Sequence, residues 1–191
     1  MRTWRGDAPA PVMRWDPRRR TRWLAMLGIL LAGFSCIRLD ADDWPLLTEG
    51  IRQRYPNVRQ ITTTEWASWQ AHPDTVQPLL LDVRTPAEFA ISHLSGAQRA
   101  DELTQALTAL SDAAPDTPIL LYCSVGYRSS RLADQLRQRG YTQVANLEGS
   151  LFAWANEGRP LVDEHDKATH LAHPYNATWG KLLKPELIWK P

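Results

Sequence analysis

A cysteine and an arginine lie five residues apart in a short stretch of this 191-residue chain. Cys123 and Arg128 belong to the sequence YCSVGYRSS, which follows the apolar run PILL and precedes LADQLRQRG. The apolar run is typical of a buried strand, and the last segment carries apolar residues at helical spacing. A cysteine in a turn between strand and helix, with a cation nearby, is a candidate nucleophile.

The turn favours a thiolate over a thiol at Cys123. Between a strand and a helix, several backbone N–H groups point into one concavity, and the helix dipole adds about half a positive charge there. Gly126 permits the positive φ that such a turn needs, and Arg128 adds a full charge. A free cysteine titrates near ~8.5, and such surroundings lower its pKa by one to several units. The alternative is an inert cysteine buried at the end of a core strand.

Alternating strands and helices surround this turn. Their spacing predicts a compact α/β fold with a mostly parallel central sheet flanked by helices. Thr85, Pro86 and Glu88 form a capping-box pattern, so Glu88 is interpreted as a capping residue rather than an acid catalyst. The expected strands are residues 59–64, 79–83, 118–122 and 143–147. The expected helices are residues 40–56, 64–70, 85–94, 101–111 and 150–157, with a further helix from about residue 128 to the residue before Gly140.

The N-terminal segment differs in composition from the rest of the chain. Seven arginines and two aspartates fall within residues 1–22, so the net charge of +1 conceals a basic block and a mildly acidic remainder. The acidic remainder gives no support for nucleic-acid binding. Residues 23–37 carry no charge. As a helix these residues would span roughly 22 Å, which is less than the ~30 Å hydrocarbon core of a membrane. A basic block before an apolar run of this length is typical of an export signal.

Export sets the expected location of the chain and the fate of its second cysteine. Positive charge before the apolar run predicts that the chain beyond it lies outside the cytoplasm, in the periplasm or anchored to the membrane facing it. Cleavage, lipidation and retention as an anchor all stay open, and membrane contact is expected only through residues 23–37 if they are retained. Loss or membrane burial of Cys36 leaves Cys123 without a partner for an internal disulfide.

Three segments, in order, resemble the rhodanese family of sulfurtransferases. Residues 79–97, LLLDVRTPAEFAISHLSGA, resemble its DVR…E…GHIPGA segment, and residues 122–141, YCSVGYRSSRLADQLRQRGY, resemble its active-site loop and following helix. Residues 146–162, NLEGSLFAWANEGRPLV, resemble its usual ending. The chain departs from the family pattern at SHLS, residues 92–95, where Gly-His-Ile-Pro is frequent, and at Ser150, where a second glycine is common.

The resemblance implies that Cys123 takes a sulfane sulfur from thiosulfate or a similar small donor, forms a persulfide, and passes the sulfur to a thiol, cyanide or a protein acceptor. No cofactor is expected. His93 is interpreted as structural rather than as a base for the cysteine. The loop residues expected to bind substrate are Ser124, Val125, Gly126, Tyr127 and Arg128, and those expected to support them are Asp82, Arg84 and Ser129.

Two other functions are compatible with the same loop. A sulfur carrier or regulatory binding module would accept sulfur on Cys123 with little turnover. A related cysteine-dependent phosphatase is less favoured, because such enzymes use a longer C-x5-R loop around a tetrahedral phosphate. The spacing from Cys123 to Arg128 is C-x4-R, which suits a smaller sulfur-bearing site.

Composition divides the chain into three parts. Residues 1–38 are the expected signal or anchor, residues 40–162 the rhodanese-like domain, and residues 163–191 an aromatic tail. The three histidines of the tail, His165, His170 and His173, have a spacing that matches no helix face, so a metal site is not expected. The tail is predicted to pack on the domain and to cover part of the mouth above Cys123, through Tyr175, Trp179, Leu182, Leu183 and Trp189.

Overall fold

The computed structural model describes residues 43–72 and 74–191. The predicted export segment, residues 1–38, therefore lies outside the described residues. Within the described residues, no helix combines the length and the apolar character that crossing a membrane requires.

The centre of the fold is a five-stranded, wholly parallel sheet with the strand order β1-β5-β4-β2-β3. This confirms the predicted α/β class. The strands are β1 (Arg59–Ile61), β2 (Leu79–Asp82), β3 (Gln98–Arg99), β4 (Ile119–Tyr122) and β5 (Val144–Leu147). In the register of the sheet, Asp82 at the end of β2 lies beside Tyr122 at the end of β4. Cys123 therefore emerges at the same edge as Asp82, since parallel strands end together.

Strand β4 is the centre of the core. All four of its residues are buried, and its neighbours β2 and β5 are mostly or wholly buried as well. A parallel strand covered on both faces reads as a continuous apolar run, and this is why β4 and β2 could be predicted. Strand β3 was not predicted, because its two residues are polar and carry no strand signal; pairing with Leu81 and Asp82 forms it.

The helices begin and end close to the predicted positions. Helix α3 begins one residue earlier than expected, because the Thr62 side chain accepts from the Glu65 backbone N–H and ends β1 at Ile61. Helix α4 stops at Ile91, three residues before the predicted end. The helices are α2 (Trp44–Arg54), α3 (Thr63–Gln70), α4 (Pro86–Ile91), α5 (Leu103–Ala109), α6 (Tyr127–Gln138) and α7 (Ser150–Asn156).

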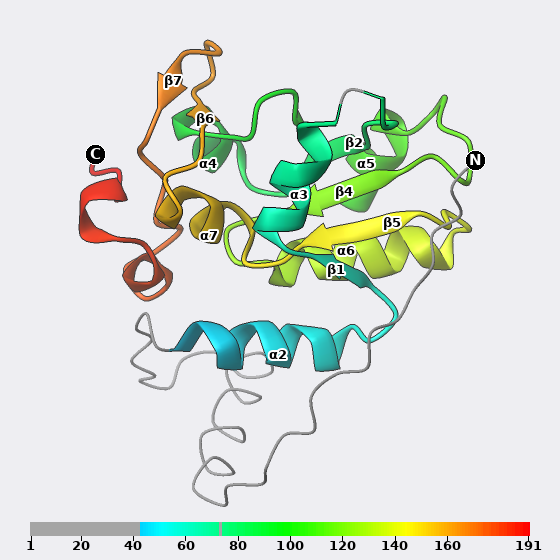
Figure 1. Ribbon diagram of the computed structural model, residues 1–191, viewed down its shortest axis with the longest axis horizontal. Coiled ribbons are helices and arrows are strands. Elements are labelled where there is room, and N and C mark those ends of the chain that lie inside the picture. Colours follow the sequence, from blue (N-terminus) through cyan, green and yellow to red (C-terminus); the bar gives the residue numbers. More distant parts are fainter. Residues whose placement is uncertain (1–42, 73) are drawn as a thin grey trace, which may run out of the picture. The chain divides into compact units, whose positions relative to one another are not determined.

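The helices cover both faces of the sheet. Helix α6 packs against β4 and β5, and α2 lies on the same side of the sheet in Figure 1. Helix α3 lies on the opposite side and contacts α7. This layering places the start of α6 directly after the end of β4, so the turn that carries Cys123 is held between a central strand and a packed helix.

The segment after residue 160 forms short elements rather than a further layer. Strand β6 (Leu161–Val162) pairs antiparallel with β7 (Ala168–Thr169), and two 3-10 turns follow, η3 (Trp179–Leu182) and η4 (Pro185–Leu187). Leu182 and Leu183 are buried. The Asn156 side chain brackets this region, since it donates to the Leu182 carbonyl at 2.7 Å and accepts from the Lys184 N–H at 2.9 Å.

Candidate active site

Cys123 is held by the backbone of its own turn. Its sulfur accepts a hydrogen bond from the Gly126 N–H at 3.1 Å, and the residue is 1% exposed. The first turn of α7 fixes the same segment from the other side: the Leu151 N–H donates to the Cys123 carbonyl and the Phe152 N–H to the Ser124 carbonyl. N–H groups that a helix start leaves without intrahelical partners thus bind the loop.

The surroundings of Cys123 favour its thiolate form. Burial raises the pKa of the thiol, but the Arg128 charge, the nearby hydroxyl and N–H of Ser129 and the N–H of Gly126 together lower it by more, so the pKa lies below its ordinary value. Ser129 is fully buried at the start of α6, and within the described residues its hydroxyl has no hydrogen-bond partner.

The turn requires glycine at position 126. Gly126 has φ +106°, a value that side chains disfavour, and a Cβ there would lie 3.2 Å from the amide nitrogen of Asn146. In this conformation the Gly126 N–H donates to the Cys123 sulfur at 3.1 Å. The prediction that this glycine supplies a positive φ is confirmed.

Arg128 does not point freely into the site but binds a carboxylate. Its guanidinium donates to both oxygens of Glu88, at 3.0 Å and 2.7 Å, and to the Ser124 hydroxyl at 3.0 Å. Ser124 in turn donates to Glu88 at 2.9 Å. Against the opposing effect of burial, the hydrogen bonds and charge of Arg128 and the N–H of Thr85 hold the pKa of Glu88 at about 2. Glu88 is therefore ionised across the physiological range.

Glu88 also forms the predicted capping box. Its carboxylate accepts from the Thr85 N–H and hydroxyl, and its own N–H donates to the Thr85 hydroxyl. The capping role was predicted, whereas the pairing with Arg128 was missed. A carboxylate has about four acceptor positions, so a buried capping glutamate has capacity for a second partner. This spare capacity was the sequence signal that could have indicated the pairing.

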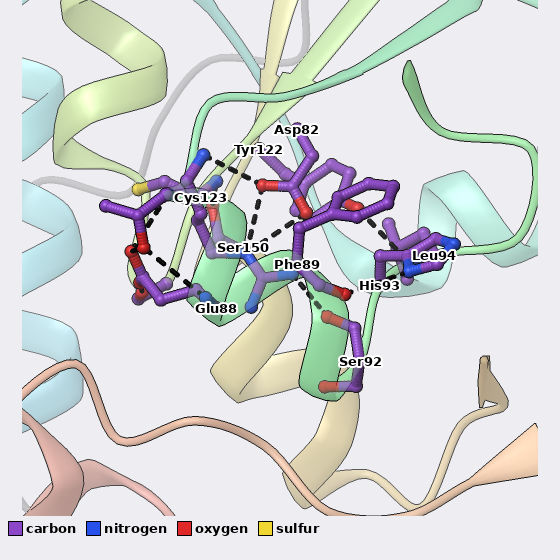
Figure 2. Close-up of polar contacts among 12 residues, drawn as sticks. Asp82, Glu88, Phe89, Ser92, His93, Leu94, Tyr122, Cys123 and Ser150 are labelled. Carbon is purple, nitrogen blue, oxygen red and sulfur yellow. Dashed lines mark hydrogen bonds and ion pairs between the residues drawn. The ribbon is translucent and has the colours of Figure 1, made fainter. Parts of the chain in front are cut away.

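Asp82 and Arg84 form a fully buried ion pair beside the site. The Arg84 guanidinium donates to Asp82 at 2.6 Å and 2.9 Å and also donates to the Ser92 carbonyl at the end of α4. The Tyr122 hydroxyl accepts from the Leu94 N–H, which ties the end of β4 to the same loop (Figure 2). These contacts connect the ends of β2 and β4 to the loop that carries Glu88, and the supporting role expected of Asp82 and Arg84 stays a prediction.

Ser150 holds the backbone of Cys123. Its hydroxyl accepts from the Cys123 N–H at 3.1 Å and donates to the Leu147 carbonyl at 2.9 Å, and Figure 2 shows the two residues beside each other. Ser150 has φ +51°, in the left-handed region that favours glycine. The sequence marked this position only as a departure from a glycine pattern, and the bond to Cys123 was missed.

Three further residues that the sequence singled out are Val125, Tyr127 and His93. Val125 is buried within the turn, and Tyr127 lies partly exposed at the start of α6. The His93 ring stacks on Phe89 at 3.8 Å and its Nδ1 lies 3.1 Å from the Phe89 carbonyl (Figure 2). Its described contacts are thus with α4 rather than with Cys123, as a structural histidine requires.

Two tyrosines from outside the strand-and-helix core reach the loop. Tyr55, directly after α2, packs edge-on against Tyr127 with ring centroids 5.6 Å apart. Tyr175, in the C-terminal segment, lies with its ring 4.8 Å from the Arg128 guanidinium carbon. The predicted tail therefore approaches the loop through Tyr175, whereas the contact from Tyr55 was not foreseen.

This arrangement suits nucleophilic attack by sulfur. A thiolate held by N–H donors attacks a sulfur or other soft centre without a separate general base. Among the described residues, no cluster of three or more histidine, cysteine, aspartate or glutamate side chains is placed to bind a metal ion.

Comparisons with known proteins agree on the kind of domain. The family model of the rhodanese-like domain matches residues 63–157. A sulfurtransferase of Allochromatium vinosum is 38% identical over 91 residues, which cover 47% of this chain and 82% of that protein. The thiosulfate sulfurtransferase GlpE of Pseudomonas aeruginosa is 31% identical over 75 residues, covering 39% of this chain and 67% of that protein.

A solved structure supports the fold. The solution structure of a rhodanese-like domain from Anabaena superposes with a TM-score of 0.50 at 23% identity, covering 62% of this chain and 89% of that one. The matched region is a smaller part of other relatives: it covers 61% of one from Bacillus subtilis and 21% of one from Mycobacterium tuberculosis. Helix α2 and the whole segment after residue 157 lie outside the family match.

Proposed function

The chain belongs to the rhodanese-like domain family, and from that premise we propose that it is a sulfurtransferase that carries sulfane sulfur on Cys123 as a persulfide. The hydrogen bond from the Gly126 N–H to the Cys123 sulfur, at 3.1 Å, carries this proposal. It supports a thiolate that is held at the carboxyl end of a central strand, where parallel α/β sheets bind ligands.

The proposed reaction has two displacements at sulfur. The Cys123 thiolate attacks the sulfane sulfur of the donor, a new S–S bond forms, and the donor's S–S bond breaks with its electron pair on the leaving group. An acceptor thiolate or cyanide then attacks the outer sulfur and regenerates the Cys123 thiolate. Thiosulfate is the donor that the family resemblance implies, with sulfite as its leaving group. Electrons balance within each step, so neither step needs an external oxidant or reductant.

The loop residues have distinct proposed roles. The Gly126 N–H and the Ser129 hydroxyl and N–H stabilise negative charge on the Cys123 sulfur and on the added sulfur. Ser124 and Arg128 fix the loop through Glu88. Val125 and Tyr127 form the wall of the site. Asp82 and Arg84 position the neighbouring loop, and no part of this chemistry needs a cofactor.

Intact-mass measurement before and after incubation with a sulfane-sulfur donor tests the proposal. We expect a gain of one sulfur atom on the wild type, loss of that sulfur on addition of cyanide, and no gain in Cys123→Ser. Sulfur gain without transfer to any acceptor would instead identify a carrier module. Hydrolysis of an aryl phosphate without sulfur gain would identify a phosphatase and overturn the proposal.

We further propose that the chain is exported. The basic block before the uncharged run 23–37 supports this location. Fractionation of cells that express the full chain would detect the domain in the periplasm or on the membrane, and deletion of residues 23–37 would return it to the cytoplasm. Recovery of the full chain from the cytoplasm would contradict export.

A further inference from the structure

The charge of Arg128 is already compensated. Its guanidinium binds both oxygens of Glu88, at 3.0 Å and 2.7 Å, in the two-point geometry that guanidinium and carboxylate groups favour. The Glu88 side chain is 1% exposed, and Ser124 and Thr85 satisfy its remaining acceptor positions. The Glu88–Arg128 pair therefore has no net charge, so it attracts a distant anionic ligand less than an unpaired arginine would, although the Arg128 charge still acts on the adjacent sulfur.

The C-terminal segment covers part of the same guanidinium, whose side chain is 26% exposed. The Tyr175 ring lies 4.8 Å from the Arg128 guanidinium carbon, within the range of a cation–π contact. Tyr175 has φ +61°, a backbone conformation that non-glycine residues seldom adopt. Tyr175 also lies outside residues 63–157, which the family model matches, so this cover belongs to the chain's own extension.

The second arginine near the strand ends is also paired with a carboxylate. Arg84 is fully buried against Asp82 and contributes no free positive charge. With Cys123 as a thiolate, the two ion pairs and the sulfur together carry one negative charge. A dianionic donor such as thiosulfate would bring two further negative charges into a largely buried site, with the N–H and hydroxyl donors of the turn as the remaining attraction.

We propose that the Cys123 site selects an organic persulfide, with a single negative charge at its reacting sulfurs, over the dianion thiosulfate. This inference rests on the proposed function and specifies its donor. In the proposed step, the Cys123 thiolate attacks the outer sulfur of R–S–S⁻, the donor's S–S bond breaks, and R–S⁻ leaves with the electron pair. The products are the Cys123 persulfide anion and a thiolate, so atoms and charge balance.

The test compares glutathione persulfide with thiosulfate as donors to the full chain, with cyanide as acceptor. For the wild type, kcat/KM is expected to be at least tenfold higher with the persulfide. Glu88→Gln keeps the capping-box geometry but removes the charge that compensates Arg128. The ratio of kcat/KM for thiosulfate to that for persulfide should therefore rise at least tenfold, mainly through a lower KM for thiosulfate.

A second variant and a control complete the test. Tyr175→Leu, at a half-exposed position, removes the aromatic ring from the Arg128 guanidinium. It should raise the ratio of kcat/KM for thiosulfate to that for persulfide severalfold. This variant remains informative if Glu88→Gln fails to fold. Asp116→Asn removes one exposed negative charge three residues before β4 begins, at the edge of the sheet opposite Cys123, and should leave the ratio unchanged.

The outcomes separate this inference from the proposed function. A wild type that uses thiosulfate as well as the persulfide, or variants that leave the ratio unchanged, would overturn the donor selection while the sulfurtransferase assignment stands. Failure of Cys123 to gain sulfur from either donor would overturn both.

Discussion

At the scale of single residues, Ser150 shows how the site uses strain. A non-glycine residue at φ +51° has a less favourable backbone than glycine by about 1–2 kcal/mol. Its hydroxyl offsets this cost, because it satisfies the buried Cys123 N–H at 3.1 Å. A backbone N–H left without a partner in this position would cost about 1–3 kcal/mol. The side chain therefore stabilises the backbone from which the reactive sulfur extends.

Two substitutions separate these effects. Ser150→Ala keeps the strained backbone and loses the hydroxyl, so we expect a loss of about 1–3 kcal/mol in the free energy of unfolding. Ser150→Gly loses the same hydrogen bonds but relieves the strain, so it should be more stable than Ser150→Ala by about 1 kcal/mol. Urea denaturation measures both. Equal stability of the two variants would contradict the strain, and a fully stable Ser150→Ala would contradict the hydrogen bond.

Residue types predicted the nucleophile better than they predicted its partners. The roles of Gly126 in the turn and of Glu88 in the capping box were readable, because each follows from local backbone requirements. The Glu88–Arg128 pair joins residues 40 positions apart, and the Ser150–Cys123 bond joins residues 27 apart. Local spacing contains no information on contacts of this length, so they emerge only when the strands are placed side by side.

At the scale of elements, the ends of β2 and β4 are held together by buried charges. The Asp82–Arg84 pair has no solvent exposure, and Arg84 also reaches the Ser92 carbonyl at the end of α4. Removing one member of a buried pair leaves the other charge without compensation, and this costs far more than losing an exposed pair. The pair thus fixes the loop between β2 and α4, which carries Glu88.

Asp82→Asn tests the bracing role. We expect a loss of about 3–5 kcal/mol in the free energy of unfolding, because the substitution leaves the Arg84 charge buried. Asp101→Asn is the matched control: it breaks a pair with Arg99 whose side chains are 25% and 31% exposed, and it should cost less than about 1 kcal/mol. Similar losses in the two variants, measured by urea denaturation, would contradict the bracing role.

Strong local signals allowed most elements to be predicted. The apolar runs gave β2 and β4, and threonine caps gave the starts of α3 and α4 to within a residue. Strand β3 escaped prediction because its two polar residues pair through the register of β2 rather than through any preference of their own. Elements of this length depend on their neighbours, so sequence patterning cannot reveal them.

At the scale of the whole molecule, segments on either side of the family match contact the active-site loop. Tyr55 follows α2 and packs on Tyr127, while Tyr175 lies over Arg128. The C-terminal segment is held by buried leucines, Leu182 and Leu183, and by the bracket from Asn156. The tail thus contacts both the domain and the active-site loop. That it covers part of the mouth above Cys123, and that the boundaries lie at residues 38–40 and 162–163, stay predictions.

Deletion of residues 168–191 tests the contribution of the tail. Burial of a leucine side chain contributes about 1.5–3 kcal/mol, so loss of the two leucines should lower the free energy of unfolding by roughly 3–6 kcal/mol, less the entropy of ordering the segment. Asn156→Ala is a milder variant that removes only the two hydrogen bonds of the Asn156 side chain, so it should lower the free energy of unfolding by a smaller amount. Unchanged unfolding of the shortened chain would show that the tail does not support the domain.

The most direct test of the central claim is the pH titration of the Cys123 thiolate by its ultraviolet absorbance, taken as the difference between the wild type and Cys123→Ser so that Cys36 cancels. Because the charge of Arg128 and the donors from Ser129 and Gly126 lower the pKa of Cys123, the thiolate should persist as the pH falls through the ordinary midpoint near ~8.5 and disappear only below it. Arg128→Gln should move the midpoint upward. A wild-type midpoint at or above that of a free cysteine would contradict a preformed thiolate, and with it the proposed chemistry of the site.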